Sequence, residues 1–159
     1  MIAPTPLRLA LYEPDIAANT GTILRLAACL GVGVDVIEPC GFVWSEPKLR
    51  RAGMDYLDRV DLVRHASWQR FRARPAAGRL VLLSTKAPAR LPGFRFAPGD
   101  TLLLGRESAG VPDAVRDAAD TAVRVPMAAG ERSLNVALAA ALVLGEALRQ
   151  LDAFPEDQR

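Results

Sequence analysis

Three segments of the sequence combine polar side chains with small residues in a way that suits a ligand site. In the first, a loop broken by Pro14 leads into a helical pattern that carries Asn19 and Arg25. Arginine is the side chain best suited to bind a phosphate or a developing oxyanion. A surface ion pair explains Arg25 more simply when this segment is taken alone.

The second segment is a buried strand, 102–104, that ends in an acidic turn flanked by Gly105 and Gly110. Ligands of open α/β sheets bind beyond the carboxyl ends of strands, so the turn has a suitable place. Glycine lets the backbone approach a ligand closely. A plain turn between a strand and a helix has the same pattern, so the turn alone is weak evidence.

In the third segment, the strand 123–125 is followed by Pro126, Met127 and a loop of small residues. Ser133 then begins a long helix as its predicted N-cap, and Asn135 lies in the first turn. Ordinary helix capping explains both polar residues, so this segment is also open to a purely structural interpretation.

The elements that must position these segments alternate between strands and helices. Strands are predicted at 7–11, 34–37, 60–63, 80–83, 102–104 and 123–125. Helices are predicted from a cap at Asn19 or Thr20 to Gly31, at 44–52, from a cap at Ser67 to 72, at 112–119 and at 133–151. This alternation predicts an α/β fold with a largely parallel sheet flanked by helices. Residues 1–154 form one predicted domain, followed by a polar tail at 155–159.

The last predicted helix is apolar on nearly all sides. Leu134, Leu138 and Leu142 mark one stripe, while Val143 and Leu144 fill another side. A helix of this kind is buried on more than one face. In a chain this short, the second face predicts a partner subunit.

Composition narrows the possible chemistry. The 159 residues are 50% hydrophobic and 24% charged, which is ordinary for a globular domain. No uncharged apolar stretch of about twenty residues and no signal peptide is visible, so we expect a cytoplasmic protein without a membrane span. His65 is the single histidine, and Cys29 and Cys40 are the two cysteines. We therefore expect no metal, and two buried free thiols.

Positive charge is concentrated in the middle of the chain. Residues 48–86 carry ten basic and three acidic side chains, although the whole chain has a net charge of only +2. A basic segment in a mildly acidic remainder suits a polyanion. A solvated surface in an arginine-rich protein explains the same distribution equally well.

The three segments together, in this order, resemble the SPOUT methyltransferases, and within them the minimal enzymes that methylate the wobble ribose of transfer RNA. The matching stretches cover about residues 7–151 and read LYEPDIAANTGTILRLA, IEPCGF, RRAGMDY, STK, LLLGRESAGVP and RVPM followed by RSLNVALA.

The resemblance implies a deep trefoil knot near the C-terminus, a cofactor, S-adenosylmethionine, and a homodimer. It implies an active site shared between subunits, with the Asn19–Arg25 region supplied by the partner. The implied cofactor-binding residues are Leu83, Ser84, Thr85, Gly105, Glu107, Gly110, Val125, Pro126, Met127, Ser133 and Leu134.

The resemblance also implies 2′-O-methylation of cytidine or uridine 34 in the anticodon stem-loop. The implied catalytic residues are Arg25, Asn19, Glu107, Ser133 and Asn135. Arginine is effectively always protonated, so we expect Arg25 to hold phosphate or stabilise the forming alkoxide. The expected RNA-binding residues are Lys48, Arg50, Arg51, Tyr56 and Lys86. Tyr56 and Trp44 are candidates for stacking on bases, with a core position favoured for Trp44.

Three other functions remain open at this point. One is ribose methylation at another transfer RNA position or in ribosomal RNA. A second is a non-catalytic RNA-binding dimer, against which the presence of Arg25, Glu107, Ser133 and Asn135 argues. A third is methylation of a small molecule, against which the basic segment argues.

Overall fold

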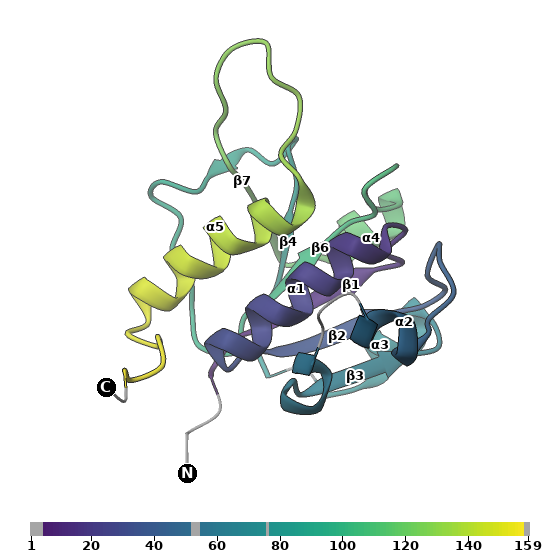
Figure 1. Cartoon of the computed structure of the whole chain (residues 1–159). Helices are drawn as coiled ribbons and strands as arrows, with labels where there is room; N and C mark the ends of the chain where they lie inside the picture. The colour runs from purple at the N-terminus through teal and green to yellow at the C-terminus, as the bar shows by residue number, and fades with distance from the viewer. Residues whose placement is uncertain (1–4, 52–54, 76, 158–159) are drawn as a thin grey trace.

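Seven parallel strands form one sheet at the centre of the molecule (Figure 1). The structure, a computed structural model, describes residues 5–51, 55–75 and 77–157. The strands are β1 (Arg8–Tyr12), β2 (Gly33–Ile37), β3 (Leu62–His65), β4 (Leu80–Leu83), β5 (Ala89–Arg90), β6 (Thr101–Leu104) and β7 (Thr121–Arg124). Their order is β3-β2-β1-β6-β4-β7-β5, so β6 lies between β1 and β4. All six pairings are parallel.

Helices cover both faces of this sheet, which confirms the predicted α/β class. They are α1 (Ala17–Leu30), α2 (Glu46–Arg51), the 3-10 helix η1 (Asp55–Arg59), α3 (Trp68–Ala73), α4 (Asp113–Ala118) and α5 (Val136–Gln150). Helices α1 and α5 pack against each other on one face (Figure 1). The segment between β7 and α5 loops out beyond the sheet (Figure 1).

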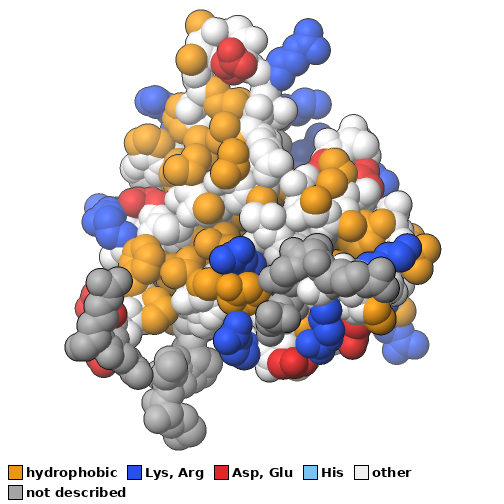
Figure 2. Space-filling model, in the orientation of Figure 1, with side chains coloured by type: hydrophobic (Ala, Val, Ile, Leu, Met, Phe, Trp, Pro, Cys, Tyr) orange, Lys and Arg blue, Asp and Glu red, His pale blue; other side chains and the backbone are white. Residues whose placement is uncertain are grey.

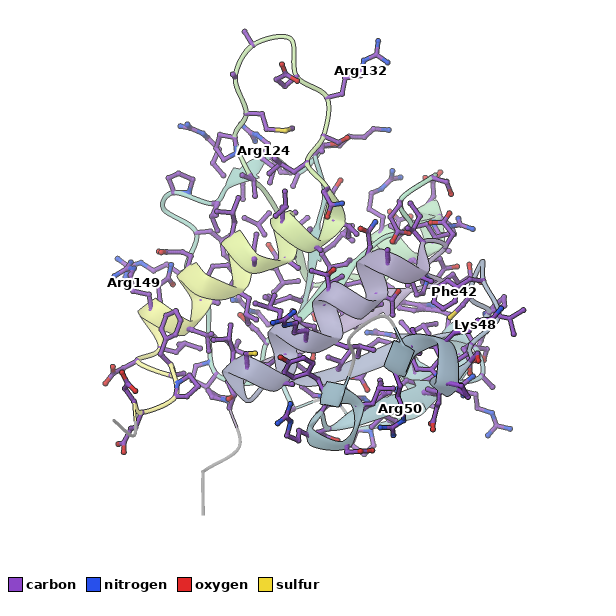
Figure 3. All side chains as sticks on the ribbon, viewed as in Figure 1. Phe42, Lys48, Arg50, Arg124, Arg132 and Arg149 are labelled. Atoms are coloured by element: carbon purple, nitrogen blue, oxygen red, sulfur yellow. The ribbon has the colours of Figure 1, made fainter. Side chains whose placement is uncertain are left out.

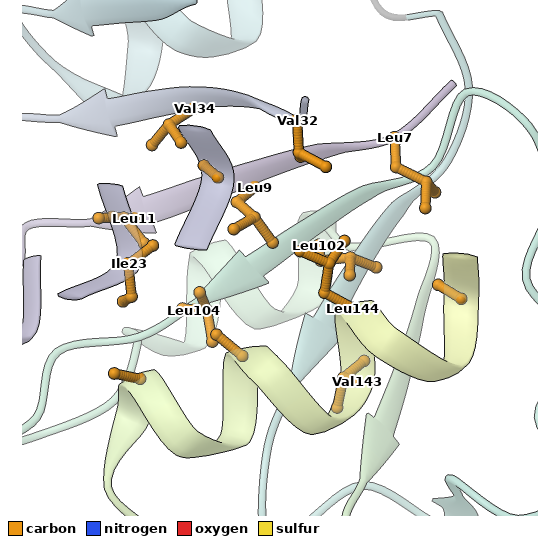
Figure 4. Packing of buried hydrophobic residues seen from close by; sticks show 14 of the residues in the cluster. Leu7, Leu9, Leu11, Ile23, Val32, Val34, Leu102, Leu104, Val143 and Leu144 are labelled. Carbon is orange, nitrogen blue, oxygen red and sulfur yellow. The ribbon is translucent and has the colours of Figure 1, made fainter. Parts of the chain in front are cut away.

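The central strands are buried on both sides, which explains their nearly continuous apolar sequence. Leu102 and Leu104 point into the core beneath α1 and α5, together with Leu144 (Figure 4). Leu103 points the other way, into a second core that Phe71 of α3 and Val115 of α4 complete. Both cores fix the positions at which the strands end, and therefore the positions of the loops that follow them.

The helix caps differ in part from the prediction. Ser67 caps α3 by accepting a hydrogen bond from the Arg70 amide at 3.1 Å, as predicted. The cap of α5 is Asn135 and not Ser133, which lies outside the helix. Helix α1 begins at Ala17 after Ile16, so neither Asn19 nor Thr20 is its cap.

His65 and the two cysteines have no catalytic surroundings. The imidazole Nε2 lies 2.8 Å from Asp35, a fully buried carboxylate that also pairs with Arg8 and Arg74. His65 therefore belongs to a cluster around the buried Asp35 that links β1, β2 and β3. Both thiols are free, but Cys29 is exposed and only Cys40 is half-buried, so the prediction of two buried thiols is wrong for Cys29.

Candidate functional site

A cavity of about 630 Å³ lies beyond the carboxyl ends of β4, β6 and β7. Since parallel strands end at the same edge of a sheet, the three loops that follow these strands converge there. Apolar side chains of the strand ends form one wall, including Leu83, Leu104 and Val123. Residues from the loops 84–86, 105–111 and 125–135 form most of the rest, and the lining is completed by Ile16 and Asn19 at the start of α1, Arg116 of α4, and Val136 and Ala139 of α5.

Most of the residues expected to bind the cofactor line this cavity. They are Leu83, Ser84, Thr85, Gly105, Glu107, Gly110, Val125, Met127, Ser133 and Leu134. Pro126 is not among the lining residues. Of the expected catalytic residues, Asn19, Glu107, Ser133 and Asn135 line the cavity, and Arg25 does not.

The turn between Gly105 and Gly110 is closed by its own backbone. Arg106 and Gly110 exchange two backbone hydrogen bonds of 3.0 and 2.8 Å. A Cβ atom on Gly105 would stand 2.8 Å from the backbone of Gly110, closer than real contacts allow. Gly110 has φ +62°, a conformation that glycine adopts without strain. The glycine turn exposes main-chain groups beside an apolar wall, and these can bind a nucleoside. The cavity therefore fits S-adenosylmethionine, which contains one.

Three of the expected catalytic side chains are hydrogen-bonded to one another. The Asn135 amide donates to Asn19 Oδ1 at 3.0 Å, and the Asn19 amide donates to Glu107 Oε1 at 3.4 Å. Asn135 Oδ1 accepts the amides of Ala137 and Leu138 as the cap of α5. This chain of contacts joins α1, the 105–110 turn and α5. It also places Asn19 in the cavity of its own chain, whereas the resemblance implied that the partner supplies it.

Asp15, which was not among the site residues predicted from the sequence, holds Glu107 in place through hydrogen bonds. The Asp15 amide donates to Glu107 Oε2 at 3.0 Å, and the Glu107 amide donates to Asp15 Oδ1 at 3.1 Å. The Ser108 hydroxyl donates to the other Asp15 oxygen. A Cβ atom on Gly41 would lie 2.5 Å from that of Asp15, so glycine at 41 lets the neighbouring loop pass this close to Asp15.

The two carboxyl groups have pKa values shifted in opposite directions. Burial and a side-chain hydrogen bond with Asp15 raise the pKa of Glu107. Hydrogen bonds from Glu107 and Ser108 lower the pKa of Asp15. Glu107, the carboxyl group that lines the cavity, is therefore the stronger base of the pair.

Arg25 lies outside the cavity on the exposed side of α1. It is six residues beyond Asn19, or about 9 Å further along the helix. Its guanidinium lies 5.1 Å from the ring centroid of Tyr56, and that of Arg59 lies 4.8 Å from the same ring. Tyr56 therefore already stacks with two arginines of its own chain, which argues against the expected stacking on a base.

The other expected RNA-binding residues lie in two places. Lys48 and Arg50 belong to α2, and the side chain of Lys48 points away from the molecule (Figure 3). Arg50 forms a two-point ion pair with Asp58, with N–O distances of 3.1 and 2.7 Å. Lys86 lines the cavity. The side chain of Arg51 falls outside the described residues. Trp44 packs against the main core and stacks on Phe42, as favoured from the sequence.

The outward face of α5 is apolar and uncovered. Leu138 and Leu142 are 59% and 51% exposed, and Leu134 just before the helix is 38% exposed. Their spacing of four residues places them on one stripe. A space-filling view shows hydrophobic side chains gathered over the region of α5 (Figure 2). The opposite face, including Val143, Leu144 and Leu148, is fully buried in the core.

Two features are absent from the described part of the chain. No helix there is long and apolar enough to cross a membrane. No group of three or more histidine, cysteine, aspartate or glutamate side chains in these ranges could hold a metal ion.

Comparisons with known proteins agree with this geometry. A curated protein of Beijerinckia indica subsp. indica, named tRNA (cytidine(34)-2'-O)-methyltransferase, is 60% identical over 148 residues, which cover 92% of each chain. A solved structure described as giving structural insights into the 2-OH methylation of C/U34 on tRNA matches with a TM-score of 0.87 and 42% identity. That match covers 94% of this chain and 99% of the solved one.

A third relative was solved with its cofactor. The SpoU methyltransferase AviRb from Streptomyces viridochromogenes, in complex with AdoMet, matches with a TM-score of 0.81 and 32% identity. That match covers 96% of this chain and 61% of the larger relative. Residues 6–145 match the SpoU rRNA Methylase family. The protein is therefore a member of the SpoU methylase family.

Proposed function

We propose that the protein transfers a methyl group from S-adenosylmethionine to the ribose 2′-hydroxyl of cytidine or uridine 34, the wobble nucleotide of transfer RNA. The observation that carries this proposal is the single cavity formed by the 83–86, 105–110 and 125–135 loops in a chain 60% identical to a cytidine-34 methyltransferase. Since that substrate is transfer RNA, we also propose a cytoplasmic location.

The cavity would hold the cofactor between its bare backbone and its apolar wall. Leu83 and Val125 offer apolar surface, Gly105 leaves room for a close approach, and Ser133 adds a hydroxyl. When bound, S-adenosylmethionine supplies a methyl group that is already activated on sulfur. The protein therefore needs mainly to orient the two reactants, which is worth roughly 7–11 kcal/mol in favourable cases. The deep trefoil knot implied by the resemblance remains a prediction.

The chain Asn135–Asn19–Glu107 would fix the polar side of the cavity. Each side chain is hydrogen-bonded to the next, so none needs to reorganise when the ribose enters. Preorganised dipoles of this kind lower barriers more than mobile groups do. Arg25 is exposed and outside its own cavity, which suits a role in the cavity of a partner subunit, where it would bind phosphate or the forming alkoxide.

A homodimer would cover the apolar stripe of α5. Fully burying a leucine side chain contributes about 1.5–3 kcal/mol, so Leu134, Leu138 and Leu142 would stabilise the pair substantially. Ile16, which lines the cavity and is 46% exposed, adds apolar surface beside the site. A second copy packed there would bring its own α1 and Arg25 near the cavity, as the resemblance implies.

The anticodon stem-loop would bind through the basic segment. Lys48 presents positive charge on α2, where the neighbouring Arg50 is paired with Asp58, and Lys86 presents it at the cavity itself. Phosphate contacts of this kind supply affinity and orientation, while the loops at the cavity would select the nucleotide. No metal takes part in this proposal.

The proposal can be tested with a synthetic anticodon stem-loop in two forms. One form carries ribose at nucleotide 34, and the other carries 2′-deoxyribose at that nucleotide alone. With tritiated S-adenosylmethionine, we expect label only in the ribose form, because the deoxy form lacks the accepting oxygen. Equal labelling of the two forms would contradict the proposal.

A further inference from the structure

Among the described residues that line the cavity, one side chain can take a proton. The ionisable side chains among its described lining residues are Lys86, Arg106, Glu107 and Arg116. Lysine and arginine are cations that only donate hydrogen bonds, whereas an ionised carboxylate only accepts them. Methyl transfer to a hydroxyl releases one proton for each methyl group transferred. Within this part of the cavity, only Glu107 has the chemistry to accept it.

We propose that Glu107 accepts the proton of the ribose 2′-hydroxyl and that Asp15 is the residue that positions it. The proposal rests on the proposed function, which supplies the ribose. In the balanced step, the carbon–oxygen bond to the methyl group forms, the carbon–sulfur bond breaks, S-adenosylhomocysteine leaves and the hydroxyl proton passes to the Glu107 carboxylate.

Hydrogen bonds fix the side chain of Glu107 in one position, as a proton acceptor requires. One oxygen accepts from Asn19 at 3.4 Å and the other from the Asp15 amide at 3.0 Å, so the side chain has one orientation. A carboxylate oxygen has two lone pairs, so each oxygen can accept a further hydrogen bond from a substrate. The Glu107 amide and the Ser108 hydroxyl return two contacts to Asp15, which lock the turn in place.

The charges around Glu107 favour this role. The charged side chains nearest to it or sharing its cavity, among those described, are Asp15 before α1, Glu13 and Arg106, which pair at 3.4 Å, and Lys86 and Arg116. Burial and Asp15 together raise the pKa of Glu107, which makes its ionised form a stronger base. Removing the charge of Asp15 should therefore lower the pKa of Glu107.

Three variants test the proposal: Glu107→Gln, Asp15→Asn and the matched control Glu13→Gln, which removes a carboxylate from the same loop without touching Glu107. Positioned proton acceptors contribute roughly 100- to 10,000-fold to a rate. We expect E107Q to lose about 100-fold or more in single-turnover rate while calorimetry shows cofactor affinity within about threefold of the wild type. A loss of less than about tenfold would overturn the assignment of Glu107.

Titration of the carboxyl carbon by nuclear magnetic resonance gives a readout independent of turnover. The Glu107 signal is identified by its absence in E107Q. We expect D15N to lower its pKa, and to move the acidic limb of the pH–rate profile to lower pH, while E13Q moves neither. A Glu107 titration unchanged by D15N would overturn the role of Asp15. A wild-type protein that does not label transfer RNA would contradict the proposed function, whereas an active E107Q contradicts only the proton acceptor.

Discussion

The side-chain amide of Asn135 donates a hydrogen bond of 3.0 Å to the side chain of Asn19, although the two residues are 116 positions apart in the sequence. Asn135 also caps α5, so one side chain both begins the last helix and ties it to the first. The position of the 125–135 loop is therefore coupled to that of α1, and both border the same cavity.

The two roles of Asn135 can be separated by substitution. Aspartate keeps the oxygen that caps α5 but loses the amide that donates to Asn19. We expect N135D to unfold at a denaturant concentration close to that of the wild type, while N135A loses about 0.5–2 kcal/mol. Both variants should methylate more slowly, because both lose the contact with Asn19. Wild-type activity in N135D would show that this contact is dispensable.

Gly105 should be essential for cofactor binding. A Cβ atom there meets the backbone of Gly110 at 2.8 Å, and backbone cannot move aside as a flexible side chain can. We expect Gly105→Ala to weaken S-adenosylmethionine binding by about tenfold or more, equivalent to about 1.4 kcal/mol, as measured by calorimetry. Thermal unfolding of the same sample shows whether the fold survives. Unchanged affinity would mean that the turn does not contact the cofactor.

Arg25 should matter for turnover and not for cofactor binding. It lies outside its own cavity, on the exposed side of α1. We expect Arg25→Ala to abolish methyl transfer to transfer RNA and to leave the dissociation constant of S-adenosylmethionine nearly unchanged. Mixing this variant with E107Q provides a check across the dimer. If each site combines two chains, mixed dimers regain one complete site and partial activity, whereas recovery of none would place Arg25 in its own subunit's site.

The stripe on α5 should control the oligomeric state. Replacing Leu138 and Leu142 with aspartate would bury two charges at the proposed interface, which is strongly unfavourable. We expect this double variant to be monomeric by light scattering and inactive. Val43→Asp is the matched control, because Val43 is 82% exposed and lies on the loop before α2. A dimeric double variant would place the interface elsewhere.

Binding of transfer RNA should weaken steeply as salt is added, because each phosphate contact releases counterions. We expect Lys48→Ala and Lys86→Ala each to reduce the slope of log affinity against log salt by about one. Arg149→Ala removes a charge at the far end of the molecule (Figure 3) and should leave the slope unchanged. An affinity independent of salt would show that the basic segment does not contact the phosphates of the RNA.

Local patterns predicted six of the seven described strands, although β3 begins two residues later than predicted and β5 was missed. They predicted the contacts between distant segments poorly. Leu80–Leu83 and Leu102–Leu104 could be recognised because strands buried on both faces have continuous apolar runs. The strand order could not, because periodicity is local. Ser133 is as good a cap residue as Asn135, and the sequence does not show that α5 begins at Val136, where Asn135 accepts the two capping amides.

The same contrast between local patterns and distant contacts applies to the candidate site. Residues on the three loops were recognised through the family's motifs, which stand at the ends of strands. Asp15 was missed although it lies in the first of these segments, because its partner Glu107 is 92 residues away and nothing local indicates the contact. Tyr56 was expected to stack on a base, because a sequence does not show that Arg25 and Arg59 already occupy its ring.

Mapping the methylated nucleotide is the sharpest test of the proposed function. Total transfer RNA is incubated with the protein and isotopically labelled S-adenosylmethionine, digested, and analysed by mass spectrometry of the fragments. We expect one labelled methyl group, on the ribose of cytidine or uridine 34, in fragments from the anticodon loop. A label on a base, or on the ribose of any other nucleotide, would contradict it.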